Sequence, residues 1–258
     1  MKTNKGIVIS NHCVNNKYHH LIIKCKSLAE EVKEGQIVHI RCGVNEDPFL
    51  RRPFSVYRFD KENEELEIVY IVKGKGTEIM THFKSGDKID ILGPTGNGYK
   101  LNDKAKSIVV IGRGVGSASI ISIAEKAVKQ NMKVIAILSG KDKTSILGDN
   151  FLNSLGCIVY SLNDEDGNSS LDNVRDILEK HIKEEKIDQI FTCGSNRIGK
   201  FVKDINNNYK IPSFISLEEK MACGIGVCLA CVCKTVNGYK TVCKHGPVFP
   251  IEEVCFND

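Results

Sequence analysis

The 258-residue sequence lacks several features that would place it in other classes of protein. No hydrophobic run approaches the roughly 20 residues that a helix needs to cross a bilayer, so a membrane span is not expected. Charge of one sign is not in excess, because 36 basic residues face 32 acidic ones, and scattered lysines argue against a nucleic-acid surface. Residues 1–6 lead straight into a strand-like run, which excludes a signal peptide. We therefore expect an ordinary soluble, folded protein.

Cysteine is the residue that the sequence has in unusual number. An odd count of 11 cysteines without a secretion signal argues against a disulfide framework and for a reducing compartment, the cytoplasm. Five of the 11 fall between Cys223 and Cys243. Such clustering in a reducing compartment favours metal binding or redox chemistry.

The first part of the chain has the pattern of an antiparallel β domain. Short strand-like runs, separated by Gly, Asn and Asp, are expected at residues 6–10, 20–25, 36–42, 66–72 and 88–92. Several short strands at this spacing are typical of a closed barrel or sandwich. We predict an antiparallel β-barrel domain over residues 1–101.

The pattern changes to alternating strands and helices over residues 102–215. Apolar strands are expected at residues 107–111, 134–138, 157–160 and 189–192, with helices at 118–130 and 171–185. This alternation predicts a doubly wound parallel α/β domain. Residues 216–258 are short and rich in cysteine and glycine, so we expect them to form a small C-terminal module without a core of its own.

Four cysteines of this module follow the spacing of plant-type ferredoxins. Four residues separate Cys223 from Cys228, two more separate Cys228 from Cys231, and Cys243 follows a predicted turn. Each iron of a 2Fe–2S cluster takes two thiolates, and glycines within the loop allow the tight backbone that brings the sulfurs together. The spacing therefore predicts that these four cysteines ligate an iron–sulfur cluster, most simply a 2Fe–2S cluster.

Two alternatives to this assignment stay open. Structural zinc sites usually show two paired C-x2-C motifs, whereas this segment has only the pair Cys228 and Cys231. Cys233 competes with Cys231 for a ligand position, and we interpret Cys233 as a packing residue because Cys231 completes the spacing. Unligated buried cysteines are the remaining possibility.

Two motifs in the β domain together predict a flavin dinucleotide. Arg52 and Ser55 form an Arg-x-x-Ser motif, in which the guanidinium can pair with a phosphate and the hydroxyl can contact the flavin ring; alone it also fits a surface ion pair. Downstream, Gly76 and Thr77 precede a helix expected to open at Glu78. Backbone amides at such a helix end can bind an anion, although an ordinary capped helix has the same sequence.

A glycine-rich turn in the α/β domain predicts a dinucleotide site. Gly112, Gly114 and Gly116 lie between a strand and a helix, where glycines allow a tight turn and close phosphate approach. Cys193 and Gly194 follow a second apolar strand, where ligands of such sheets bind. Cys193 either approaches the nicotinamide or is a buried thiol at a strand end.

Taken together, these motifs resemble the electron-transfer subunit of class 1B, NAD-dependent dihydroorotate dehydrogenase, of the PyrK type, within the ferredoxin-reductase superfamily. The resemblance covers essentially the whole chain and is most specific over residues 217–234 and 239–249. Residues 50–55 and 92–99 also match.

The resemblance implies the cofactors, their residues and a partner. It implies FAD, NAD and a 2Fe–2S cluster, the last on the four cysteines named above. The implied FAD residues are Arg52, Pro53, Phe54, Ser55, Val69, Tyr70, Ile71, Gly76 and Thr77. The implied partner is an FMN-containing catalytic subunit that oxidises dihydroorotate in pyrimidine biosynthesis, usually in a two-plus-two heterotetramer. The chain would then relay electrons between that subunit and NAD⁺, with no catalytic side chain of its own.

The sequence departs from the family at the nucleotide loop. Arg113 replaces the second of three family glycines, and Ser119 replaces a proline. This departure admits a second hypothesis, a small subunit of a related NAD(P)H:ferredoxin or sulfide dehydrogenase complex. Asp142 would suit a ribose 2′-OH, whereas Lys141 or Lys143 would suit a 2′-phosphate, so nucleotide preference stays open. A zinc-stabilised flavoprotein scaffold is a third, non-enzymatic hypothesis.

Overall fold

The computed structural model describes residues 2–15, 17–43 and 47–256. The chain forms two compact units. The first unit comprises Met1–Gly98, Glu218–Cys233 and Tyr239–Val248. The second unit comprises Tyr99–Leu217, Lys234–Gly238 and Phe249–Asp258. Among the described helices, none is long and apolar enough to cross a membrane.

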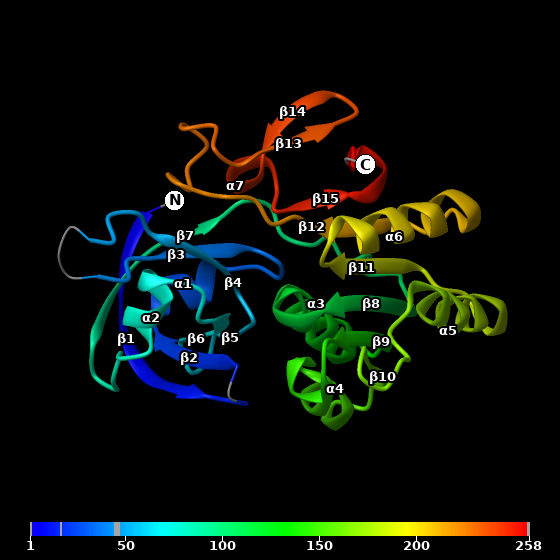
Figure 1. The fold of residues 1–258 in the computed structure, drawn as a ribbon, viewed down its shortest axis with the longest axis horizontal. Helices are drawn as coiled ribbons and strands as arrows, with labels where there is room; N and C mark the ends of the chain where they lie inside the picture. Colours follow the sequence, from blue (N-terminus) through cyan, green and yellow to red (C-terminus); the bar gives the residue numbers. More distant parts are fainter. Residues whose placement is uncertain (1, 16, 44–46, 257–258) are drawn as a thin grey trace. The chain divides into compact units, whose positions relative to one another are not determined.

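The first unit is built on a seven-stranded sheet in the order β4-β3-β7-β1-β2-β6-β5, in which neighbouring strands are antiparallel. The strands are β1 (Lys2–Cys13), β2 (Tyr18–Lys24), β3 (Ile37–Ile40), β4 (Arg52–Ser55), β5 (Arg58–Asp60), β6 (Glu65–Ile71) and β7 (Lys88–Thr95). Two short helices, α1 (Lys26–Glu31) and α2 (Lys75–Met80), accompany them (Figure 1).

This sheet closes around one apolar core, as the predicted barrel requires. Alternate residues of β7 are buried, so one face of the strand lines the core. Four strands separate β4 from β6 in the sheet order, yet the rings of Phe54 on β4 and Tyr70 on β6 lie 5.9 Å apart. A ring contact between strands so distant in the order requires the sheet to curl onto itself. Leu21, Ile68 and Ile91 are fully buried in this core.

The second unit is a doubly wound sheet in the order β10-β9-β8-β11-β12-β15, visible as a ladder of strands in Figure 1. Its strands are β8 (Ser107–Arg113), β9 (Lys133–Gly140), β10 (Ile158–Asn163), β11 (Gln189–Cys193), β12 (Ser213–Ser216) and β15 (Val248–Pro250). The helices are α3 (Ala118–Lys129), α4 (Asp149–Ser154), α5 (Leu171–Glu184) and α6 (Asn196–Tyr209), with 3-10 turns η1 (Gly114–Ser117), η2 (Lys143–Ser145) and η3 (Ile251–Glu253).

The winding direction of this sheet reverses beside β8. From β8 the chain proceeds outward to β9 and β10, then returns to place β11 on the other side of β8, parallel to it. Ligands of such sheets bind at the carboxyl ends of the strands where the order reverses. The glycine loop after β8 and the Cys193 turn after β11 both lie at this reversal.

The cysteine-rich segment carries a hairpin and a short helix, namely β13 (Val232–Thr235), β14 (Gly238–Thr241) and α7 (Val242–His245). The expected turn at Asn237-Gly238 connects the two strands, and Gly238 has a φ of +97°. Residues of the segment are shared between the two units, and all four predicted ligand cysteines belong to the first unit. The division of the chain into three domains at residues 101 and 215 therefore stays a prediction.

Candidate functional site

The cysteine loop has the tight backbone that its glycines predict. Gly224 and Gly226 have φ values of +69° and +79°, and Leu229 also lies in the left-handed region at +58°. Backbone N–H groups of this loop point at cysteine sulfurs. Gly226 N lies 3.1 Å from Sγ of Cys243, and Ile225 N lies 3.4 Å from Sγ of Cys223. Donors directed at the sulfurs stabilise thiolate, the form that ligates iron.

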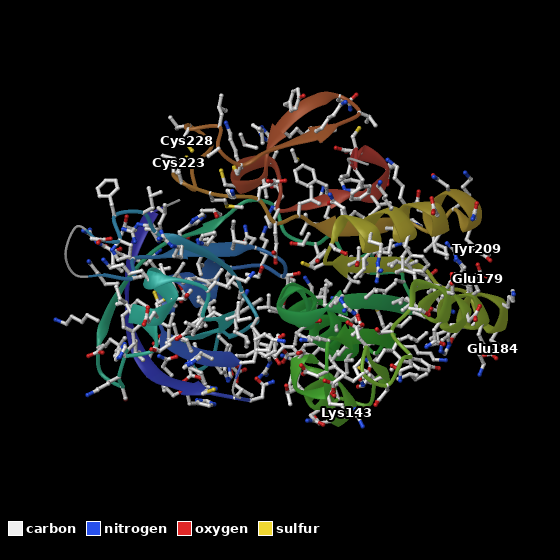
Figure 2. The ribbon with its side chains drawn as sticks, viewed as in Figure 1. Lys143, Glu179, Glu184, Tyr209, Cys223 and Cys228 are labelled. Atoms are coloured by element: carbon white, nitrogen blue, oxygen red, sulfur yellow. The ribbon has the colours of Figure 1, made fainter. Side chains whose placement is uncertain are left out.

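The four predicted ligand cysteines associate as two pairs. Cys223 accepts hydrogen bonds from Cys228, and Cys231 accepts one from the backbone N of Cys243, which lies 3.4 Å from Sγ of Cys231. Within the described residues, no three His, Cys, Asp or Glu side chains surround one common metal position. Two thiolate pairs are the donor set that a two-iron cluster takes, with two sulfurs for each iron. Figure 2 labels Cys223 and Cys228 on the loop.

The pKa values of Cys223 and Cys243 move in opposite directions. Burial raises the pKa of Cys223, but the backbone N–H groups of Cys228 and Ile225 outweigh it and bring this pKa down to about 6. Burial and the neighbouring Cys231 thiol raise the pKa of Cys243 to about 12. The loop therefore holds Cys223 readily as thiolate, whereas the Cys243 sulfur needs positive charge close by before it ionises.

Asn97, just after β7, anchors the helix that carries Cys243. Its side-chain Nδ2 donates to the carbonyl of His245 at 2.9 Å, and its backbone N donates to the carbonyl of Gly246. Gly96, with a φ of +77°, allows this approach, because a methyl group there would lie 2.2 Å from the Gly246 carbonyl oxygen. The end of β7 thus sets the position of the fourth cysteine, although 148 residues separate Asn97 from His245.

His39 on β3 packs directly against the cysteine loop. A methyl group on Gly224 would lie 2.6 Å from Cε1 of His39, so only glycine fits there. The Thr95 hydroxyl donates to the carbonyl of Ile37 and therefore accepts from Nε2 of His39 at 3.1 Å. Burial, together with the charge of Arg51, lowers the pKa of His39 to about 4, so the ring is neutral at pH 7. No motif pointed to His39 in the sequence.

The predicted flavin motif lies next to His39. Residues Arg52–Ser55 form β4, where Pro53 is directly opposite His39 of β3. All four residues of β4 are partly exposed, as a ligand-contacting strand requires. The Arg52 side chain lies over the predicted phosphate turn, since a methyl group on Gly76 would be 3.1 Å from Nε of Arg52. The structure thus brings together two motifs that are distant in the sequence.

The other predicted flavin residues have more restricted roles. Tyr70 is 1% exposed, and its hydroxyl donates to Oδ1 of Asn11 at 3.2 Å, so its ring belongs to the barrel core. Val69 is buried and Ile71 is partly exposed, so a ligand beside β6 meets mainly backbone.

Helix α2 begins at Lys75 rather than at Glu78 as predicted, which corrects the helix start. The Thr77 hydroxyl accepts from the backbone N of Lys73 and caps this helix.

The glycine loop after β8 and the turn after β11 meet at the reversal of the sheet. Gly112 pairs with Cys193 across the two strands, and a methyl group on Gly116 would lie 3.4 Å from the Cys193 carbonyl oxygen. Gly114 and Gly194 have positive φ values, +55° and +158°. Cys193 is 1% exposed, which favours the buried-thiol alternative over direct contact with a nicotinamide ring. The five predicted nucleotide residues therefore form one continuous edge.

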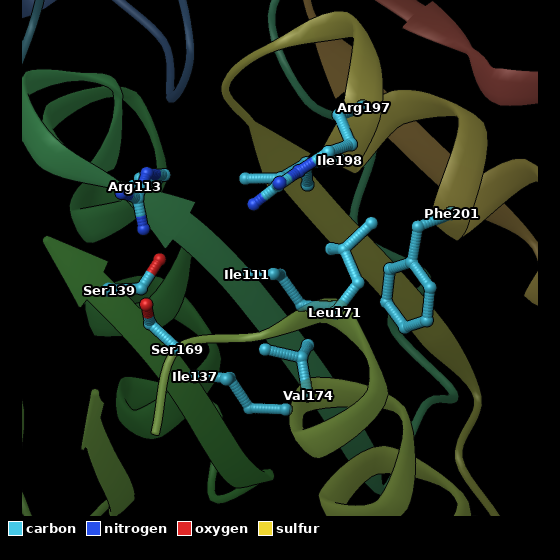
Figure 3. Close-up of a pocket in the computed structure, with 10 residues that line it drawn as sticks. All are labelled: Ile111, Arg113, Ile137, Ser139, Ser169, Leu171, Val174, Arg197, Ile198 and Phe201. Atoms are coloured by element: carbon cyan, nitrogen blue, oxygen red, sulfur yellow. The ribbon is translucent and has the colours of Figure 1, made fainter. Parts of the chain in front are cut away.

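A pocket beside this edge brings Arg113 of the glycine loop together with residues that the sequence did not single out. Arg113, Ser139, Ser169 and Arg197 are its polar lining (Figure 3), and apolar side chains from β8, β9, α5 and α6 complete it. Arg113 forms an ion pair of 2.6 Å with Asp164 from the loop after β10. The pairing of Arg113 could not be read from the glycine motif.

The lysines and Asp142 that were candidates for ribose contacts do not line this pocket. Asp142 instead caps the turn η2, because its Oδ1 accepts from the backbone N of Ser145 at 2.8 Å and from the Thr144 hydroxyl at 2.6 Å. Lys143 lies 3.5 Å from Asp166. The residues after β9 are therefore already engaged within the fold.

Comparisons with known proteins agree with this arrangement. Residues 218–255 match the iron–sulfur cluster binding domain of dihydroorotate dehydrogenase B. The chain is 36% identical over 257 residues, 98% of each chain, to the dihydroorotate dehydrogenase B (NAD(+)) electron transfer subunit of Caldanaerobacter subterraneus subsp. tengcongensis. It is 30% identical over 251 residues, 96% of each chain, to the subunit of that name from Desulforamulus reducens.

A solved structure of the NADH-dependent reduced ferredoxin-NADP oxidoreductase aligns with 97% of this chain and 90% of its own length, with a TM-score of 0.84 and 25% identity. The barrel, the doubly wound sheet and the cysteine loop thus define a reductase of the ferredoxin-NADP oxidoreductase type with an added iron–sulfur segment. Within that class, the chain belongs to the family of the dihydroorotate dehydrogenase B (NAD(+)) electron transfer subunits.

The family assignment confirms the resemblance drawn from the sequence. It also confirms, at the level of the family, the predicted fold class, the oxidoreductase role and the cofactor set of FAD, a 2Fe–2S cluster and NAD. The individual residues assigned to those cofactors stay predictions.

Proposed function

We propose that this chain is the electron-transfer subunit that links an FMN-containing dihydroorotate dehydrogenase subunit to NAD⁺ in pyrimidine biosynthesis, with FAD and a 2Fe–2S cluster as its redox groups. One observation carries the proposal. His39 packs against Gly224 of the cysteine loop, and its strand pairs with the flavin strand at Pro53. A cluster loop and a flavin strand separated by one buried side chain suit electron transfer between them.

We assign the cluster to the two cysteine pairs, Cys223 with Cys228 and Cys231 with Cys243. The pairing of their sulfurs and the loop N–H donors support this ligand set. Cys233 stays outside it, because Cys231 completes the spacing and its Sγ accepts from the backbone N of Cys243 at 3.4 Å. Burial and the nearby Glu219 carboxylate also raise the pKa of the Cys233 thiol.

We assign FAD to the strand Arg52–Ser55, to residues 69–71 of β6 and to the turn at Gly76 and Thr77. The guanidinium of Arg52, lying over Gly76, suits a flavin pyrophosphate. Arg52→Ala is expected to lose FAD, measured as the ratio of 450 nm to protein absorbance. A purified variant with stoichiometric FAD would contradict the assignment.

The side chains of this chain bind and orient the redox groups, and we assign no catalytic acid or base. When bound, flavin exchanges one or two electrons while the cluster exchanges one, which allows conversion between a hydride and single electrons. The barrel core excludes water from one side of the flavin strand. Gly112 and Gly116 let the loop after β8 pack closely against Ser117 and Cys193, which forms the edge that we assign to the nucleotide.

We place the catalytic partner against the cysteine loop. Val227 and Leu229 are 73% and 60% exposed beside the ligand cysteines, and Tyr239 of β14 is 75% exposed. Exposed apolar side chains next to a redox centre suit a protein interface. We expect the complex to be a two-plus-two heterotetramer. We expect it in the cytoplasm, because no disulfide joins any of the cysteines in the described part of the chain.

The test is co-expression with an FMN-containing dihydroorotate dehydrogenase subunit. We expect the chains to co-purify and to reduce NAD⁺ when dihydroorotate is added. Val227→Asp should weaken the complex, whereas Val14→Asp, which adds the same charge at an exposed position of the barrel, should not. Failure of the two chains to associate, with both correctly folded, would refute the proposal.

The second candidate is a small subunit of a NAD(P)H:ferredoxin or sulfide dehydrogenase complex. The likeness to the NADH-dependent reduced ferredoxin-NADP oxidoreductase favours it, as does the arginine in the nucleotide loop. If the complex turns over with NADPH but not with NAD⁺ and dihydroorotate, this candidate replaces the first. A zinc-stabilised scaffold would instead show flavin absorbance without iron–sulfide bands.

A further inference from the structure

We propose that Arg113 and Arg197 form a phosphate-binding pair for the nucleotide. In the protein without nucleotide, the Asp164 carboxylate occupies the position of the phosphate, and it thereby determines which nucleotides bind. The proposal rests on the nucleotide-binding part of the proposed function. It does not depend on the flavin, the cluster or the partner subunit.

The two arginines approach the same pocket from different elements. Arg113 ends β8 inside the glycine loop, and Arg197 lies in the first turn of α6, a helix of 14 residues. Both line the pocket, and Figure 3 shows the Arg197 guanidinium directed across it towards Arg113. Two guanidinium groups at the carboxyl edge of a parallel sheet are a donor set suited to a phosphate.

Asp164 occupies this donor set. Its Oδ2 accepts from Nη2 of Arg113 at 2.6 Å, and its Oδ1 accepts from the Ser169 hydroxyl. These two hydrogen bonds are the main reason that the pKa of Asp164 lies below its usual range, and the charges of Arg113 and Arg197 add to them. The Asp164 carboxylate is thus bound by a guanidinium and a hydroxyl, with a second guanidinium near it. Two oxygens of a phosphate group would find the same donors at this position.

The loop that carries Asp164 is fixed to the sheet independently of the carboxylate. The backbone N of Asp164 donates to the carbonyls of Gly140 and Lys141, both at 3.2 Å. Asn163 accepts from the backbone N of Asp166 at 2.9 Å, and Asn168 accepts from the backbone N of Asn163 at 2.7 Å. Replacing the carboxylate should therefore leave the loop in position and change mainly the charge beside Arg113.

The ion pair is exposed enough to be displaced. The side chains of Arg113 and Asp164 are 28% and 47% exposed, so solvent screens their attraction. A phosphate dianion carries more charge than the carboxylate and can engage both arginines, but it must first displace Asp164 and meets its repulsion. Asp164 thus lowers phosphate affinity at this position, most strongly for a ligand with a terminal phosphate monoester.

The experiment measures binding by isothermal titration calorimetry with the full-length, FAD- and iron-loaded protein. The probes are ADP, 2′,5′-ADP and inorganic phosphate, each titrated into the parent chain and the variants. We expect Asp164→Asn to tighten binding of at least one nucleotide fivefold or more. Arg113→Gln and Arg197→Gln should each weaken binding in the Asp164→Asn background. The matched control is Asp166→Asn, in the same loop, which should leave affinities unchanged.

The two nucleotides distinguish which phosphate the pair meets. If Asp164→Asn raises the affinity for 2′,5′-ADP alone, the arginine pair contacts a ribose 2′-phosphate. If it raises the affinity for both nucleotides equally, the pair contacts the diphosphate. Asp164→Ser provides a second variant if Asp164→Asn folds poorly. Equal affinities for Asp164→Asn, Asp166→Asn and the parent chain would overturn the proposal. Because no partner is present in the titration, this failure is distinct from a failure of dihydroorotate-dependent electron transfer.

Discussion

Single residues decide which cysteines can serve as ligands. Cys223 and Cys228 belong to the glycine loop, while Cys231 and Cys243 are buried below it, each 2% exposed. Cys233 lies only two positions beyond Cys231 and is buried as well, 8% exposed. The contact with Cys243 distinguishes the two cysteines, because the backbone N of Cys243 donates to Sγ of Cys231 at 3.4 Å.

The first prediction concerns this separation. Cys228→Ser should remove one thiolate and reduce bound iron and labile sulfide to a small fraction of the parent value, because oxygen is a poor ligand for these clusters. Cys233→Ser should keep the parent iron content and the signal of the dithionite-reduced cluster in electron paramagnetic resonance. Loss of the cluster in Cys233→Ser, with its retention in Cys231→Ser, would reverse the assignment.

The second prediction concerns Gly224. Gly224→Ala should lower the iron content of the purified protein and its thermal midpoint, because alanine meets both a left-handed backbone and the ring of His39. Gly238→Ala is the matched control. It has a φ of +97° and open space around the added methyl group, so it bears only the backbone strain, on the order of 1 kcal/mol.

A double-mutant cycle identifies the contact itself. His39→Ala in the Gly224→Ala background should restore part of the lost stability, since it removes the ring that the methyl group meets. Additive losses in the double mutant would show that His39 does not limit the loop.

At the scale of elements, strand ends place the functional segments. The end of β7 holds α7 through Asn97, and the ends of β8 and β11 hold the glycine edge.

The third prediction concerns the contact between Asn97 and α7. Asn97→Ala should destabilise the α7 segment by about 1 kcal/mol, the worth of one side-chain hydrogen bond. Iron release to a chelator should then be faster than in the parent protein.

Asn63→Ala is the control for Asn97→Ala, because Asn63 lies in an exposed turn, where its backbone N and its side chain donate to the Asp60 carboxylate. Equal release rates for the two variants would show that the backbone bonds of Asn97 suffice to hold α7.

The pattern of elements was largely predictable, and the exceptions have physical reasons. Continuous apolar runs marked β8 and β9 because both faces of these strands are covered. β4 was not predicted as a strand, since its four residues are all partly exposed and carry no alternation. Helix α6 was also missed, although Ile198, Phe201, Val202 and Ile205 recur at helical spacing and are buried. The helical spacing of these apolar residues predicts the helix.

At the scale of the whole molecule, the cluster cysteines belong to one compact unit and the arginine pocket to the other. The fourth prediction is that removing iron with a chelator under reducing conditions abolishes electron transfer to the partner but changes ADP affinity by less than twofold. Calorimetry on the iron-free and iron-loaded protein checks it. A large loss of ADP binding would mean that the cluster segment supports the nucleotide edge.

By itself, the sequence determined the chemistry that depends on neighbouring residues. The cysteine spacing, the glycines of the loops and the alternation of strands and helices are local patterns. Each of them follows directly from local backbone geometry. Only the tertiary structure decided which distant segments meet. The approach of His39 to Gly224, the anchoring of His245 by Asn97 and the pairing of Arg113 with Asp164 depend on sheet closure and strand order. The packing of whole elements forms these contacts. The separation of the two residues along the chain therefore does not predict that they meet.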